Sequence, residues 1–303
     1  MGGREDMIFL SNLVNGISLG SIYAIIALGY TMVYGIAKML NFAHGDIIMV
    51  GGYSIFVFAA TSFGTLPPWV SLLFAVLMAV IICALLGFGV EKLAYKPLRG
   101  ASPLAVLITA IGVSSFLQSL AQVFFGSAAK FVQFPDLGSL SLGELTVSYS
   151  TLITLISTVI VMLALTLFVK LTKTGRAMLA VSEDREAAQL MGVNINFIIS
   201  ITFIIGSSLA ALAGLFSLMN VPFIKPTFGS LPGIKAFTAA VIGGIGSIPG
   251  AMLGGILLGV VECFSNSVPT LAPYTNAIEF AILIIILIVK PTGILGKKRR
   301  EKV

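Results

Sequence analysis

The stretch WVSLLFAVLMAVIICALLGFGV, residues 69–90, decides the fold class of this chain. It contains no charged side chain, and its apolar residues follow one another without alternation. A helix needs about 20 mostly apolar residues to cross the hydrocarbon core of a bilayer. Because only helices and closed barrels satisfy every backbone polar group inside that core, a continuous apolar run of this length predicts a membrane-spanning helix.

Further runs of the same kind lie along the whole chain, at residues 8–35, 47–63, 103–125, 150–169, 197–219, 236–264 and 275–289. Of the 303 residues, 57% are apolar and only 10% are charged, whereas a soluble domain carries about 25% charged residues. So few charges cannot solvate a globular surface. We therefore predict an all-α integral membrane protein, a single transmembrane domain over residues 1–303 with about 8–10 spanning helices.

The positions of the basic residues predict which loops face the cytoplasm, because cytoplasmic loops are enriched in lysine and arginine. Most of the 18 basic residues fall in the loop 91–100, the loop 170–196 and the tail from Lys290 onward. We place these segments, together with Lys38, in the cytoplasm. The net charge of +6 is then explained by membrane topology rather than by binding to nucleic acid. The charges near the N-terminus show no bias, so its side stays open.

The same assignment requires an extra crossing near the C-terminus. The loop 220–233 must lie outside and the tail inside, so an odd number of crossings separates them. Only the runs 236–264 and 275–289 lie between, and we predict that the first consists of two short or re-entrant helices. Helix-breaking residues in its middle support this prediction: Gly243, Gly244, Gly246, Pro249 and Gly250.

A second irregular segment, residues 41–46, follows the first long run, as the glycine-rich break follows the run 197–219. The halves, about 8–130 and 150–290, therefore resemble a weak internal duplication, and the crossing directions predict that it is inverted. Broken helices in transporters often mark the solute path. We expect the translocation path near the following residues: Tyr30, Tyr34, Asn41, His44, Asp46, Gly243, Gly244, Gly246 and Gly250.

Several of the unusual residues in apolar runs have a plainer interpretation. His44 is the only histidine, and a lone histidine is usually structural. We expect Glu262 and Glu279 near the membrane interface, in contact with water. Cys83 and Cys263 lie in apolar runs and predict packing residues, not a disulfide framework or a metal site.

The longest charged internal stretch, residues 174–194, predicts a structured cytoplasmic knob. Residues 176–181 are good helix formers, and Ser182 is a plausible N-cap for a second short helix whose first turn is acidic. Gly192 can end that helix as a left-handed residue. Two short amphipathic helices would make a docking element, and a plain solvated loop is the alternative.

Within this loop, Glu186-Ala187-Ala188 followed by Gly192 resembles the EAA–G coupling motif of ABC importer permeases. Gly175-Arg176-Ala177, Glu183-Asp184 and Gly192-Val193-Asn194 resemble more specifically the branched-chain amino-acid permeases. Matching stretches elsewhere are residues 29–35, 41–45, 235–241, 243–251 and 291–296. Together they cover the chain nearly end to end, and the chain resembles the LivH-type permeases of high-affinity branched-chain amino-acid ABC importers.

The resemblance implies a bacterial inner-membrane permease for leucine, isoleucine and valine that works with other subunits. These are a second, LivM-like permease, two ATPase subunits and an extracytoplasmic amino-acid-binding protein. The chain has no G-x-x-x-x-G-K-[ST] loop, so the ATPase subunits would hydrolyse ATP, and no cofactor or metal is expected in this chain. The match implies the following coupling residues: Gly175, Arg176, Glu183, Asp184, Glu186, Ala187 and Gly192.

Other functions are tested against the same sequence. An intramembrane protease would need a Ser–His arrangement or two carboxylates that share a proton. Asp46 has no convincing partner on a matching motif, so we predict neither an enzyme nor catalytic residues. A passive channel or a secondary transporter would need no docking loop. A permease for urea, short amides or other amino acids stays an open alternative, because selectivity in such importers rests largely with the binding protein.

Overall fold

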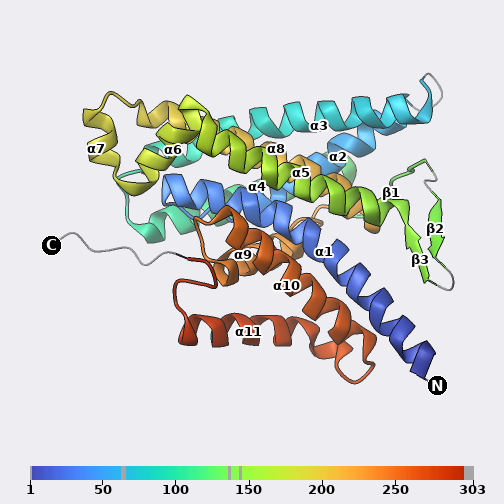
Figure 1. The fold of residues 1–303 in the computed structure, drawn as a ribbon. Helices are drawn as coiled ribbons and strands as arrows, with labels where there is room; N and C mark the ends of the chain where they lie inside the picture. Colours follow the sequence, from blue (N-terminus) through green and yellow to red (C-terminus); the bar gives the residue numbers. More distant parts are fainter. Residues whose placement is uncertain (1, 63–65, 136–137, 143–144, 297–303) are drawn as a thin grey trace. The chain divides into compact units, whose positions relative to one another are not determined.

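The computed structural model describes residues 2–62, 66–135, 138–142 and 145–296 (Figure 1). Its α-helices are α1 (Gly2–Ala37), α2 (His44–Ser62), α3 (Pro68–Val90), α4 (Pro103–Phe125), α5 (Tyr149–Leu171), α6 (Lys173–Glu183), α7 (Arg185–Leu190), α8 (Ile195–Asn220), α9 (Ser230–Gly243), α10 (Ile248–Ser267) and α11 (Thr275–Val289). Two short antiparallel pairs join β1 (Lys130–Phe131) to β4 (Phe223–Ile224) and β2 (Ser139–Leu142) to β3 (Leu145–Ser148).

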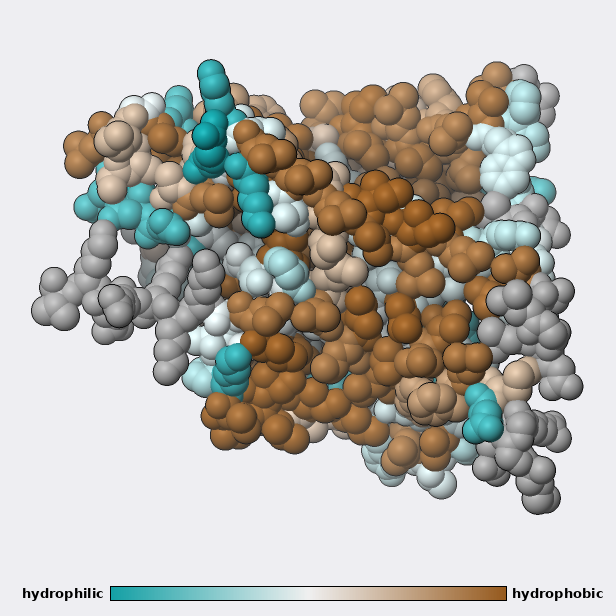
Figure 2. All heavy atoms as spheres, in the orientation of Figure 1, coloured by the Kyte–Doolittle hydropathy of each residue, from teal (hydrophilic) through white to brown (hydrophobic). Residues whose placement is uncertain are grey.

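Within the described residues, eight helices are long and apolar enough to cross a membrane, and α9 is a shorter apolar helix. The predicted runs 103–125 and 275–289 coincide with α4 and α11. Apolar side chains cover most of the visible face of the long helices, whereas hydrophilic side chains gather over α6 (Figure 2). The prediction of an all-α membrane protein is confirmed.

The chain forms two compact units, each assembled from distant segments. Unit 1 contains Met1–Thr31, Leu137–Met162 and Lys235–Val303, and unit 2 contains Met32–Asp136 and Leu163–Ile234. Three of the four boundaries fall inside helices, in α1, α5 and α9.

In unit 2, the helices α2, α3 and α8 pack against one another. Small residues let their backbones approach closely, as is common between membrane helices. A Cβ atom on Gly51 of α2 would lie 2.9 Å from Cα of Ala211 in α8 and 3.3 Å from Sγ of Cys83 in α3. Cys83 is fully buried at this junction, as expected of a packing residue.

The loops of unit 2 gather at its two ends as the predicted topology requires. At one end, Arg99 donates to Asn196, so the loop after α3 meets the start of α8. At the other end, Lys130 pairs with Ile224 in the β1–β4 ladder. Segments predicted on the same side of the membrane therefore meet in space within this unit.

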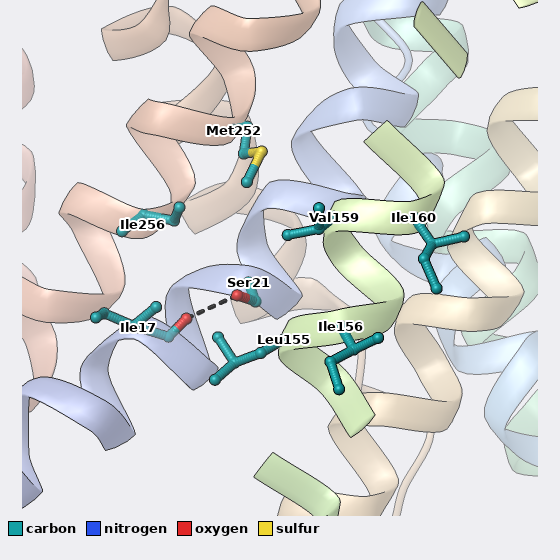
Figure 3. A pocket seen from close by; sticks show the side chains of 8 residues that line it. All are labelled: Ile17, Ser21, Leu155, Ile156, Val159, Ile160, Met252 and Ile256. Atoms are coloured by element: carbon teal, nitrogen blue, oxygen red, sulfur yellow. Dashed lines mark hydrogen bonds between the residues drawn. The ribbon is translucent and has the colours of Figure 1, made fainter. Parts of the chain in front are cut away.

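In unit 1, α1 and α10 are in close contact. A Cβ atom on Gly16 would lie 2.8 Å from Cα of Val260, and one on Gly20 would lie 2.6 Å from Cα of Ile256. An apolar pocket of about 340 Å³ also lies among α1, α5 and α10. Its one polar side chain, Ser21, donates its hydroxyl back to the carbonyl of Ile17 in the same helix at 2.8 Å (Figure 3). The hydroxyl donor of Ser21 is therefore already used within its own helix.

The predicted break in the run 236–264 is present between α9 and α10. The 14 residues of α9 span about 21 Å at 1.5 Å per residue, which is less than the ~30 Å hydrocarbon core. The carbonyls of Ile242 and Gly243 accept hydrogen bonds from the amides of Ile294 and Leu295, at 2.8 and 2.9 Å. The end of α9 thus lies beside the segment after α11, as an odd number of crossings requires.

The spacing Gly246-x3-Gly250-x3-Gly254 predicts three small residues on one helix face, and for Gly246 this prediction is wrong. Gly246 precedes α10, and a Cβ atom there would meet nothing within 4 Å. Glycine is needed at position 246 for its backbone conformation, because its φ is +95°, a value that L-residues rarely adopt. The close approaches are instead made by Gly250, against the carbonyl of Gly243, and by Gly254, against that of Ala239.

We expect Gly254→Ala to lower the melting temperature of the purified protein. The new methyl group would overlap the carbonyl oxygen of Ala239 and force α9 away from α10, and overpacking of this kind typically costs about 1–3 kcal/mol. Gly112→Ala is the matched control, because a Cβ atom at Gly112 of α4 meets nothing within 4 Å. Equal melting temperatures for the two variants would contradict the packing described here.

Candidate functional site

The segment between α5 and α8 folds into two short helices, α6 and α7, which confirms that it is a structured element. Thr172 begins α6 by accepting a hydrogen bond from the amide of Gly175 at 2.9 Å. Asp184 both ends α6 and begins α7, and its Oδ1 accepts from the amide of Ala187 at 3.0 Å. A single residue therefore joins the two helices.

The predicted N-cap of α7 is wrong by two residues. Ser182 lies inside α6 and donates its hydroxyl to the carbonyl of Leu179 at 2.7 Å. Asp184 takes the capping position instead, where its carboxylate can also interact favourably with the helix dipole. Of the acidic residues expected in the first turn, only Glu186 lies there.

Gly192 ends α7 as predicted, with a φ of +82°. The amide of Val193 donates to Ala188 and that of Gly192 to Gln189, both at 3.0 Å, which is the hydrogen-bond pattern of a Schellman motif. The turn presents its neighbours to the surroundings: Leu190 is 88% exposed and Met191 is 84% exposed.

The residues that the motif singled out thus divide into two groups. Gly175, Asp184 and Gly192 shape the backbone, and Gly175 does so by packing against the end of α5, where a Cβ atom would overlap the carbonyl of Phe168. The others present side chains at the surface of α6 and α7: Arg176, Glu183, Glu186 and Ala187.

Arg185, which the motif did not single out, connects α7 to the end of α1. Its guanidinium donates to the carbonyl of Ile36 at 3.1 Å and to that of Ala37, while Lys38 donates to the carbonyl of Gly35. The last carbonyls of a helix have no partner within the helix. Cationic side chains therefore cap the C-terminus of α1, and one of them comes from the two-helix element.

Immediately after this cap, the chain is non-helical until α2 begins at His44. Asn41, His44 and Asp46 are 3%, 1% and 2% exposed, so the break is covered by protein. Oδ1 of Asn41 accepts a hydrogen bond from the hydroxyl of Tyr95 at 2.8 Å. Tyr95 closes a π-helical turn, Glu91–Tyr95, that follows α3.

Asp46, in the first turn of α2, belongs to a second polar group of unit 2. Its Oδ1 accepts from the side-chain amide of Gln118 at 2.9 Å, and that amide also lies 3.3 Å from Oγ of Ser230. A polar side chain from α4 and one from the start of α9 thus face the beginning of α2. Sequence reasoning found Asp46 but not Gln118 or Ser230, since nothing in their local sequence marks them.

The remaining predicted path residues are distributed as follows. Tyr34 is half-buried in the last turn of α1 in unit 2. Tyr30 lies in unit 1, where its ring packs edge-on against Phe237 of α9, with 5.8 Å between the ring centroids. Also in unit 1 are the glycines of the α9–α10 break, of which Gly244 has a φ of +103°: Gly243, Gly244, Gly246 and Gly250.

The sequence did not predict a buried ion pair near the end of α3. Glu91 is fully buried and pairs with Arg99, and it also accepts a hydrogen bond from Ser200 of α8 at 2.7 Å. In the sequence, the basic residues of the loop 91–100 predicted only the side of the membrane on which it lies. In the structure, Arg99 also connects the end of α3 to the start of α8.

The expectation that Glu262 and Glu279 are solvated is wrong. The side chains of Glu262 and Glu279 are 14% and 0% exposed, and both pair with the ammonium of Lys235, whose side chain is 3% exposed. Lys235, which closely follows the predicted outer loop 220–233, lies in α9. The partners are far apart in sequence, and local hydropathy therefore could not reveal them.

A family model described as "Branched-chain amino acid transport system / permease component" matches residues 12–287. The chain belongs to this family. It is 44% identical over 306 residues to the high-affinity branched-chain amino acid transport system permease protein BraD of Pseudomonas aeruginosa, with 97% of this chain and 98% of the relative covered. It is 42% identical over 310 residues to the corresponding protein LivH of Escherichia coli K12, with 99% of each covered.

Membership of the branched-chain amino acid permease family confirms the resemblance found in the sequence motifs. The match includes α6 and α7, both breaks and all eight candidate spans except the extreme ends of the first and last. A permease is a transport component and not an enzyme. Because both relatives are branched-chain amino acid permeases, the prediction of branched-chain amino-acid transport is supported over the urea or amide alternative.

Proposed function

We propose that this chain is a permease subunit of an ATP-driven importer that moves leucine, isoleucine and valine across the bacterial inner membrane. The observation that carries this proposal is identity above 40% over nearly the whole length of two high-affinity branched-chain permeases. The working complex would include a second, LivM-like permease, two ATPase subunits and an extracytoplasmic amino-acid-binding protein.

In this proposal, α6 and α7 are the coupling helices that seat on an ATPase subunit. Their base is fixed, since Met178 and Val181 are each 1% exposed and Ala188 is 4% exposed. Their tip presents the exposed apolar pair Leu190 and Met191. Apolar side chains exposed to water favour a protein partner, and the mixed charges around them favour a specific groove over anionic lipid, which selects polybasic segments.

Arg185 would carry motion from these helices to the solute path. Its guanidinium holds the last carbonyls of α1, and the polar break with Asn41, His44 and Asp46 begins a few residues later. A displacement of α7 must therefore either move the end of α1 or break hydrogen bonds from a charged donor, each worth about 1.5–3 kcal/mol. The polar atoms of the break would make transient contacts with the ends of the amino acid.

The ends of unit 2 that carry α6 and α7 would face the cytoplasm, and the β1–β4 ladder would face outside. Since α1 is one continuous helix, its N-terminus would lie outside, opposite Lys38. The C-terminal tail would be cytoplasmic, since α9, α10 and α11 supply three alternating segments after the outer loop.

Leu190→Asp with Met191→Asp should abolish both ATPase binding and leucine uptake. These side chains are almost fully exposed, so charges here should not disturb folding, but they would oppose burial in an apolar groove. The measurement is ATP-dependent leucine uptake by proteoliposomes that contain all subunits, together with copurification of the ATPases. Gln189→Asp, exposed on the same helix, is the control and should retain both. Normal uptake by the double variant would remove this element from the coupling mechanism.

Arg185→Gln should uncouple transport while the ATPases stay bound. The neutral amide cannot replace the guanidinium at the carbonyls of Ile36 and Ala37, and a loss of about 1.5 kcal/mol corresponds to roughly tenfold less leucine transported per ATP hydrolysed. The ratio of uptake to hydrolysis measures this effect. Lys170→Gln removes one positive charge from the exposed last turn of α5 and should leave the ratio unchanged; an equal decrease for both would contradict the assigned role of Arg185.

The topology is tested with cysteines introduced at Leu271 and Leu295, which are 44% and 43% exposed. Cys83 and Cys263 are first replaced by alanine. A membrane-impermeant maleimide should label position 271 in intact spheroplasts and position 295 only after the membrane is opened, because α11 lies between them. Labelling of both positions from one side would refute the proposed orientation of α11 and the tail.

A further inference from the structure

The ion cluster of unit 1 joins four helices around one ammonium group. Nζ of Lys235 in α9 lies 2.7 Å from Oε1 of Glu262 in α10 and 3.1 Å from Oε1 of Glu279 in α11. The hydroxyl of Tyr23 in α1 donates to Oε2 of Glu262 at 2.6 Å. Nζ of Lys235 also lies 5.9 Å from the centre of the Tyr23 ring.

The charges of this cluster do not balance. Among the residues that the structure describes, Lys235 is the single cation paired with two carboxylates, so the ionised cluster would carry one net negative charge. An uncompensated charge removed from water is strongly destabilising, and Glu279 is fully buried. A second positive charge must therefore enter the cluster when it is buried.

The hydrogen bonds indicate where that charge is located. Both oxygens of Glu262 accept a hydrogen bond or ion pair, one from Lys235 and one from Tyr23. Glu279 uses Oε1 for Lys235, while its Oε2 is buried without a hydrogen-bond partner in the described part of the chain. Nζ of Lys235 lies within 3.1 Å of both carboxyl groups, so Glu262 is the neighbouring carboxylate that would accept a proton carried by Oε2 of Glu279.

We propose that this cluster is a proton-binding site, in which Oε2 of Glu279 carries one proton that it donates to the carboxylate of Glu262. Binding converts the Glu279 carboxylate to a carboxylic acid and brings the cluster from one net negative charge to neutrality. The groups that face the proton are Tyr23, Lys235, Glu262 and Glu279, one from each helix. Release of the proton at alkaline pH would leave a buried unpaired charge and weaken the attachment of α9 to α1, α10 and α11.

The test uses the complete transporter complex and compares wild type with Glu279→Gln, whose side chain imitates the neutral acid in shape and charge. At neutral pH, the infrared spectrum of the wild type should contain the carbonyl stretch of a protonated carboxyl group that Glu279→Gln lacks. This band should disappear at alkaline pH together with a decrease of about 5 °C or more in the melting temperature. The melting temperature of Glu279→Gln should stay constant over the same range.

Glu91→Gln is the matched control, since Glu91 is also fully buried but is paired with one cation, Arg99. It should keep the infrared band and should lower the melting temperature at neutral pH, because the arginine is left without a counter-charge. Three results would overturn the proposal: no carboxyl band that depends on Glu279, a Glu279→Gln variant that melts with the alkaline decline of the wild type, or stabilisation of the wild type by sodium ions in place of the band.

Discussion

The lack of hydrogen-bond partners in lipid is the constraint on which this structure depends. Every backbone polar group within a bilayer must be satisfied by protein. The backbone groups left free where a helix ends therefore need hydrogen-bond partners from another segment, which we call the cover of that helix end. At the end of α1, the cover is a pair of cationic side chains, one of which comes from α7. At the end of α9, the cover is two backbone amides of the segment that follows α11. In both cases a segment remote in sequence satisfies the break.

The same constraint governs the ionisable residues of the membrane helices. Charged groups at membrane depth are expensive and usually mark a pair or a functional site. Glu91 has Arg99, Asp46 has the amide of Gln118, and Lys235 has two glutamates. The first two arrangements connect helices within unit 2. The third holds two carboxylates on one ammonium, and this excess of negative charge is the basis of the proposed proton site.

Much of this fold could be predicted from local sequence, because lipid imposes a minimum length and composition on each span. The limits of α4 and α11, the break between α9 and α10 and the left-handed Gly192 were all predicted correctly. What could not be predicted depends on partners that are distant in the chain. Arg185 and Ile36 are 149 positions apart, and Lys235 and Glu279 are 44 apart, so hydropathy had no means of showing that Glu279 is buried.

The error at Ser182 has a local cause that bears on how the two-helix element works. Serine and aspartate are both good N-caps, but a serine within a helix can donate to a preceding carbonyl and remain there, as Ser182 does. Aspartate has no such donor, so Asp184 sets the junction two residues later and leaves Arg185 as the first residue of α7.

A helix as short as α7, with 6 residues, is not stable by itself in water. Its conformation therefore depends on the Asp184 cap, on the Schellman turn at Gly192 and on the attachment of Arg185 to α1. The Asp184 cap and Arg185 fix the start of α7, whereas the turn at Gly192 holds the exposed Leu190 and Met191 at its tip. A force applied at the tip thus meets a short rigid body that is linked to the end of α1 by the guanidinium of Arg185.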